Sequence, residues 1–75
     1  MNQYGIDPLA ETLSADELGH VDIATLRIWR NSLIDMIGAI SKDKDYDYFL
    51  LPDLVHNLQE VYYAIGRNIN TQNKN

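Results

Sequence analysis

The chain has 75 residues, a formal charge of −5 from eleven acidic and six basic residues, and no cysteine. A chain of this length builds one domain, and its core is small because folding buries only about 60% of the surface of the unfolded chain. Without cysteine the protein has no disulfide, thiolate metal site or catalytic thiol, and its acidity argues against nucleic acid, whose phosphates attract basic side chains.

Residues 1–21 are predicted to form an N-terminal arm with a short helix. Ser14 and Glu17 have the spacing of a capping box, in which a serine and a glutamate three residues later cap the first turn of a helix. A glycine follows almost at once, so the helix has room for only one or two turns. We expect Leu13 and Leu18 to pack against the rest of the domain.

The first long helix is predicted over residues 22–41, with Asp22 as its N-cap. At 100° per residue its apolar side chains span an arc of about 160°, which is wider than the stripe that one antiparallel neighbour covers. Trp29 lies near one edge of this arc and Ile34 near the other. Something besides a second helix of the same chain is therefore expected to cover this surface.

The connection, residues 42–50, is charged and opens like an EF-hand calcium loop. Its alternating aspartates are Asp43, Asp45 and Asp47. The glycine and the bidentate glutamate that such a loop needs are replaced by a tyrosine and a leucine. The two histidines, His20 and His56, lack the paired spacing of zinc ligands. No metal and no other cofactor is predicted.

The second long helix is predicted over residues 51–69, because its apolar residues follow one another at spacings of four, three, four, three and four. They are Leu51, Val55, Leu58, Tyr62, Ile65 and Ile69. This heptad-like pattern favours packing against the first helix at a shallow angle, so the predicted fold is an all-α helical hairpin in a single domain. The polar residues 70–75 are expected to form a disordered tail.

The hairpin is further predicted to pair with a second copy into a four-helix homodimer. Small domains without disulfides or metals commonly gain the missing core by association. A two-fold dimer would cover both edges of the wide apolar arc with one patch used twice. The residues expected in the dimer core are Leu26, Leu33, Ile37, Ile40, Leu54, Leu58, Val61 and Ile65.

A partner-binding row is predicted opposite the apolar stripe of the second helix. It consists of His56, Glu60, Tyr63 and Arg67, at spacings of four, three and four. A tyrosine beside an arginine is typical of protein interfaces, although an ordinary solvated face has the same pattern.

Arg30 lies inside the apolar arc of the first helix, where its charge has two interpretations. In one, it pairs with a carboxylate of the facing helix, Glu60 or Asp53. In the other, it anchors a partner protein together with Trp29, since both residue types are common at interface hot spots.

No enzyme is predicted, because the chain contains no nucleophile elbow and no glycine-rich phosphate loop. We expect a non-enzymatic protein–protein interaction module, such as an adaptor, inhibitor or regulator, that binds itself and an unidentified protein. One alternative is a nucleic-acid-associated regulator in which Arg27, Arg30 and Arg67 cluster. Another is an acidic mimic of nucleic acid that occupies a basic protein site. With no apolar stretch long enough to span a membrane, a cytoplasmic location is expected.

Overall fold

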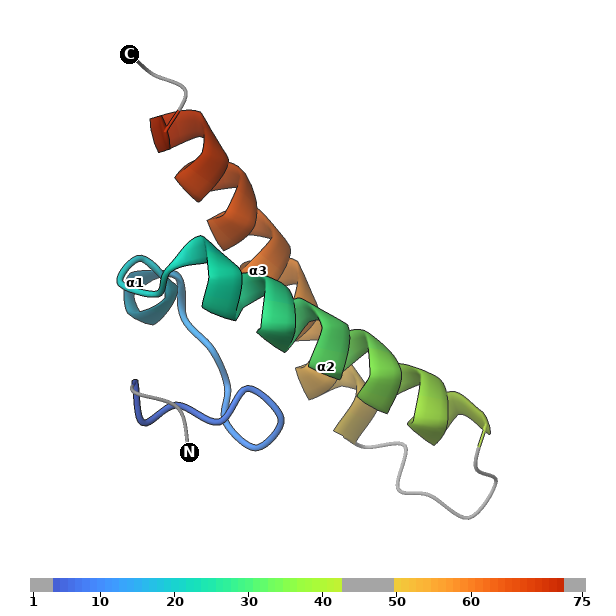
Figure 1. Cartoon of the computed structure of the whole chain (residues 1–75). Coiled ribbons are helices and arrows are strands. Elements are labelled where there is room, and N and C mark those ends of the chain that lie inside the picture. Colours follow the sequence, from blue (N-terminus) through green and yellow to red (C-terminus); the bar gives the residue numbers. More distant parts are fainter. Residues whose placement is uncertain (1–3, 43–49, 73–75) are drawn as a thin grey trace.

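The computed structural model describes residues 4–42 and 50–72, and the side chains of these ranges up to residue 69. The described residues form three helices and no strand: α1 (Ala15–Leu18), α2 (Ile23–Lys42) and α3 (Leu51–Gln72). α2 packs along α3, which confirms the predicted pair of long helices, and the arm that carries α1 packs against α3 (Figure 1). Within the described ranges, no helix is both long and apolar enough to cross a membrane.

α2 begins directly after its predicted cap, Asp22. The Asp22 carbonyl oxygen accepts a hydrogen bond from the Leu26 N–H group at 3.0 Å, which is the first bond of the helix, and its carboxylate is hydrogen-bonded to Thr25. α2 ends at Lys42, whose positive charge suits the C-terminal end of a helix dipole. The predicted calcium-like aspartates lie in residues 43–49, outside the described part of the chain.

α3 continues to Gln72, so the predicted helix end at residue 69 comes three residues too early. The prediction stopped at the last apolar residue. The backbone does not have to stop there, because no proline or glycine follows to interrupt its hydrogen bonds.

The serine of the predicted capping box caps α1, and its hydroxyl is bonded to the glutamate side chain. The Glu17 N–H group donates to Ser14 Oγ at 3.4 Å, and the Ser14 hydroxyl donates to Glu17 Oε1 at 2.8 Å. The helix is only four residues long, but it places Leu18 in the core. Leu13, just before the box, is buried as well, so the predicted packing of these two leucines is confirmed.

The core lies between α2 and α3 and is completed by the arm. Six of the residues predicted for the dimer core are buried within one chain: Leu26, Leu33, Ile40, Leu54, Val61 and Ile65. The other two, Ile37 and Leu58, are partly buried and pack against this core. The six buried side chains are therefore already covered within the single chain, whereas Ile37 and Leu58 keep part of their surface exposed.

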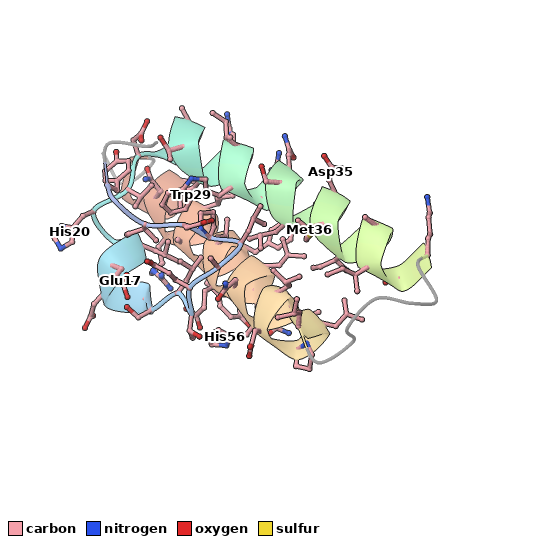
Figure 2. The ribbon with its side chains drawn as sticks, turned by 90° about the horizontal axis from the view of Figure 1, so that it is seen from below. Glu17, His20, Trp29, Asp35, Met36 and His56 are labelled. Atoms are coloured by element: carbon pink, nitrogen blue, oxygen red, sulfur yellow. The ribbon has the colours of Figure 1, made fainter. Side chains whose placement is uncertain are left out.

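The arm covers one edge of the apolar arc of α2. The rings of Tyr4 and Trp29 meet edge to face, with 6.2 Å between their centroids, and Trp29 is only 4% exposed (Figure 2). The Tyr4 hydroxyl also donates to Asp22 Oδ1 at 2.8 Å and accepts from the Asp22 N–H group at 3.3 Å. Trp29 is therefore part of the core and is not available as the predicted partner anchor.

The link between Tyr4 and Asp22 predicts a dependence of stability on acid. Hydrogen bonds from Thr25 and then from Tyr4 hold the pKa of the Asp22 carboxyl below its ordinary value. A lowered pKa means that folding favours the charged form, so this contribution is complete above about pH 5 and is lost as the pH falls below about 4. Urea titrations between pH 2.5 and 6 should show a shallower acid decline for Asp22→Asn than for the wild type.

The control is Asp35→Asn, which removes the same charge from α2 on the side away from α3 (Figure 2). This variant should keep the acid decline of the wild type. Parallel declines for the wild type and Asp22→Asn would contradict the prediction.

Candidate functional site

A buried asparagine on α3, Asn57, holds the arm against one side of the helix pair. Its Oδ1 accepts from the Leu13 N–H group at 2.9 Å, and its Nδ2 donates to the carbonyl oxygens of Pro8 at 2.9 Å and Glu11 at 2.6 Å. A turn that begins at Asp7 presents these carbonyls, because the Ala10 and Glu11 N–H groups both donate back to the Asp7 carbonyl oxygen. Three backbone groups of the arm are thus hydrogen-bonded to the side chain of Asn57.

The side of the helix pair away from these contacts bears two stripes of side chains, one on each long helix, which we call the open face. On α2 the stripe is Arg27, Arg30, Ile34, Ile37 and Ser41, at spacings of three, four, three and four. On α3 it is Leu51, Val55, Leu58, Tyr62 and Ile69. Both stripes border one open groove of about 650 Å³, because Ile37 and Ser41 line it from α2 while Leu51 and Val55 line it from α3.

The open face leaves large apolar side chains in water. Ile34 is 43% exposed, Val55 40%, Tyr62 49% and Ile69 37%. On α3 the last three are seven residues apart, so they lie on one line along the helix. Among the described residues, the second edge of the wide apolar arc, which the sequence predicted to need cover, is thus left partly exposed.

The charged residues of the open face are both arginines. Arg27 is exposed, and Arg30 is half-buried and donates from Nε and Nη2 to Asn31 Oδ1, both at 3.2 Å. Its partner is thus a neutral amide. Within the described residues Arg30 forms no ion pair with Glu60 or Asp53: Glu60 lies about 200° around α3 from Leu58, and Asp53 faces the arm.

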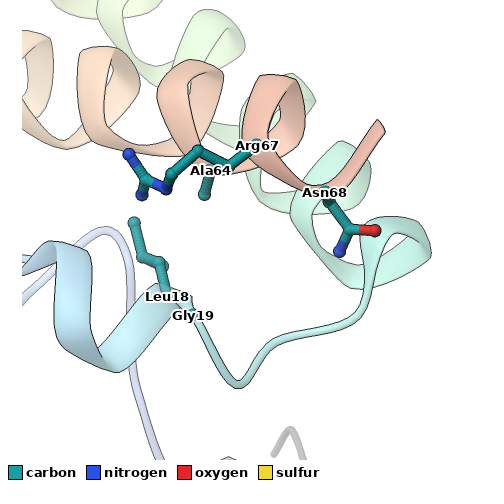
Figure 3. A pocket seen from close by; sticks show the side chains of 5 residues that line it. All are labelled: Leu18, Gly19, Ala64, Arg67 and Asn68. Carbon is teal, nitrogen blue, oxygen red and sulfur yellow. The ribbon is translucent and has the colours of Figure 1, made fainter. Parts of the chain in front are cut away.

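The predicted partner-binding row on α3 borders the arm instead of standing free. His56 Nε2 lies 3.2 Å from the Leu13 carbonyl oxygen, and since a carbonyl only accepts, this nitrogen is the donor. At the other end, Arg67 lines a small cavity of about 200 Å³ with Leu18 of α1 (Figure 3). Between them Glu60 is half-buried and Tyr63 is exposed.

The open groove is lined by two side chains of types that act in catalysis in other proteins. It contains one hydroxyl and one imidazole, from Ser41 and His56. The Ser41 hydroxyl donates to the Ile37 carbonyl oxygen at 2.8 Å, and His56 is bonded to Leu13, so each is turned to backbone and no activated nucleophile results. The described residues also contain no group of three or more His, Cys, Asp or Glu side chains that could hold a metal ion.

No protein-family model matches the chain, and no curated protein or solved structure is similar enough to count as a match.

Proposed function

We propose that this protein is a non-enzymatic protein–protein interaction module, serving as an adaptor, inhibitor or regulator, and that it binds its partner through the open face. The observation that carries the proposal is the set of exposed apolar side chains on the open face, Ile34, Val55, Tyr62 and Ile69, of which Val55 also lines the groove between α2 and α3. Contiguous apolar surface on a small protein marks an interaction site, whereas scattered single residues do not.

The energy available from covering this face supports the proposal. Full withdrawal of a large apolar side chain from water contributes about 1.5–3 kcal/mol. Side chains that are nearly half exposed therefore still offer on the order of 1 kcal/mol each. Together they supply a useful part of a binding free energy, even after the cost of association.

The alternative functions predicted from the sequence have less support in the positions of their residues. A regulator with three clustered arginines requires Arg27, Arg30 and Arg67 on one surface, but Arg67 lies beside α1 while the other two lie on the open face. The acidic mimic of nucleic acid and the cytoplasmic location stay predictions. So does the homodimer, which would have to use the open face because the core is already complete within one chain.

The test compares three substitutions of isoleucine or valine by aspartate. Ile34→Asp and Val55→Asp place a charge on the open face, and Ile28→Asp places the same charge on the solvent side of α2, where Ile28 is 63% exposed. All three replace exposed residues, so all three should fold. With each protein immobilised in a lysate of its native host, the two open-face variants should lose proteins that the wild type and Ile28→Asp retain.

Retention of the same proteins by all four chains would contradict the proposal. Melting temperatures measured in parallel separate a lost interaction from a lost fold.

A further inference from the structure

We propose that the occupant of the open face is an amphipathic helix of another protein, whose apolar stripe is flanked by aspartate and glutamate. This inference rests on the proposed function of the same face and adds the chemistry of the partner.

The charge of the open face is opposite to that of the chain. The chain as a whole has a formal charge of −5, yet the two stripes of the open face contain two arginines and no carboxylate. Both arginines lie in the N-terminal half of α2, so the positive charge is concentrated toward one end of the face. A wholly apolar partner would bury Arg30 further without an ion-pair partner, which is costly, whereas a carboxylate at the rim would pair with it.

The shape of the face fits a helix. The line from Val55 to Ile69 runs for fourteen residues, or about 21 Å, which is roughly four helical turns. A helix bonds its own backbone groups internally, so it can lie on an apolar groove that offers few polar groups to a partner's backbone. Side chains at heptad spacing on α3 match the apolar stripe of such a helix.

A second copy fits the face less well. It would bring a second Arg27 and Arg30 to the same contact and, from its own open face, no carboxylate to meet them. A two-fold pairing through this face would contain four arginines and no carboxylate from either stripe, so none of the arginines would gain an ion-pair partner there. The charge pattern therefore selects a partner of opposite sign.

The experiment uses a peptide library as the probe. Each peptide is a helix of three heptads with leucine at the a and d positions, and its flanking e and g positions are randomised among glutamate, lysine and glutamine. The library is selected on the full-length wild type and on a double variant, Arg27→Glu/Arg30→Glu. The control, Lys42→Glu/Arg67→Glu, carries the same change of net charge away from the open face.

Peptides selected by the wild type and the control should be enriched in glutamate at the flanking positions, and those selected by the double variant in lysine. For single peptides the preference should reach roughly tenfold in Kd at low salt and should shrink as ionic strength rises. Circular dichroism melts show that each variant is folded.

Three results would overturn the inference. Each of them has a different consequence for the proposal that the open face binds a partner. Equal flanking residues from the wild type and the double variant would reject the charge argument and leave the open face as a binding surface. A wild type that sediments at twice the chain mass, with Ile34→Asp at the single mass, would show a second copy as the occupant. A wild type that selects no peptide would reject the helix, and the aspartate variants in lysate would then decide whether the face binds anything.

Discussion

Replacing Asn57 by alanine is expected to detach the N-terminal arm from the helix pair. The substitution leaves the Leu13 N–H group and the carbonyl oxygens of Pro8 and Glu11 without their partner. A buried polar group without a partner costs about 1–3 kcal/mol. Because the arm can recover part of this cost by moving into water, we expect a loss of about 2–4 kcal/mol, out of the roughly 4–11 kcal/mol typical of a domain of this size.

The arm's release can be observed through Trp29, which is the only tryptophan of the chain. Its indole is buried beside Tyr4 of the arm, so its fluorescence should shift to longer wavelength in Asn57→Ala while the helical circular dichroism of α2 and α3 persists. The loss of stability is measured by urea unfolding.

Two further variants make this prediction specific. Gln59→Ala removes an amide side chain from an exposed position of α3, two residues away, and should leave both readouts unchanged. Asn57→Asp keeps the acceptor for the Leu13 N–H group but loses the donor and places a carboxylate against two carbonyl oxygens, so it should be at least as damaging as alanine. Wild-type fluorescence and stability in Asn57→Ala would show that the other contacts of the arm, such as its leucines and Tyr4, hold it without Asn57.

The helices were predictable because each is specified by nearby residues. The spacing of the apolar residues predicted both long helices, and the capping box of Ser14 and Glu17 predicted the short one. The errors at the helix ends have the same origin. The sequence pattern marks where apolar residues stop, but a backbone without a helix breaker can continue beyond them, as α3 does up to Gln72.

The position of the arm was not predictable, because it depends on contacts between residues more than forty positions apart in the chain. The sequence did contain one signal. Asn57 lies between Leu54 and Val61 on the apolar side of its helix, and a buried amide needs backbone or side-chain partners. An asparagine at a buried position of α3 therefore indicates that a non-helical segment, with free backbone groups, crosses the helix at that point.

The sequence predicts a different binding surface from the open face, for a related reason. The row of His56, Glu60, Tyr63 and Arg67 is predicted on the side of α3 opposite its apolar stripe, but the arm reaches both ends of that row, at His56 and beside Arg67. Once the arm covers one edge of the hairpin, the uncovered apolar surface is the other edge. Periodicity showed that the apolar arc was too wide for one neighbour, but not which edge would remain open.

Two neighbouring residues of α2 face different surroundings, one in the core of the single chain and the other on its open face. Leu33 is 0% exposed between α2 and α3, whereas Ile34 is 43% exposed because one residue turns the side chain by about 100°. Leu33→Asp would bury an unpaired charge and should show no cooperative thermal transition, while Ile34→Asp should melt close to the wild type.

Leu33→Ala, a milder change, should lose about 2–5 kcal/mol of unfolding free energy. Since Leu33 belongs to the core of one chain, the Leu33→Ala midpoint in urea should not depend on protein concentration, as it would for a residue buried only in a dimer. A folded, helical monomer of Leu33→Asp would contradict this assignment and return Leu33 to an interface between copies.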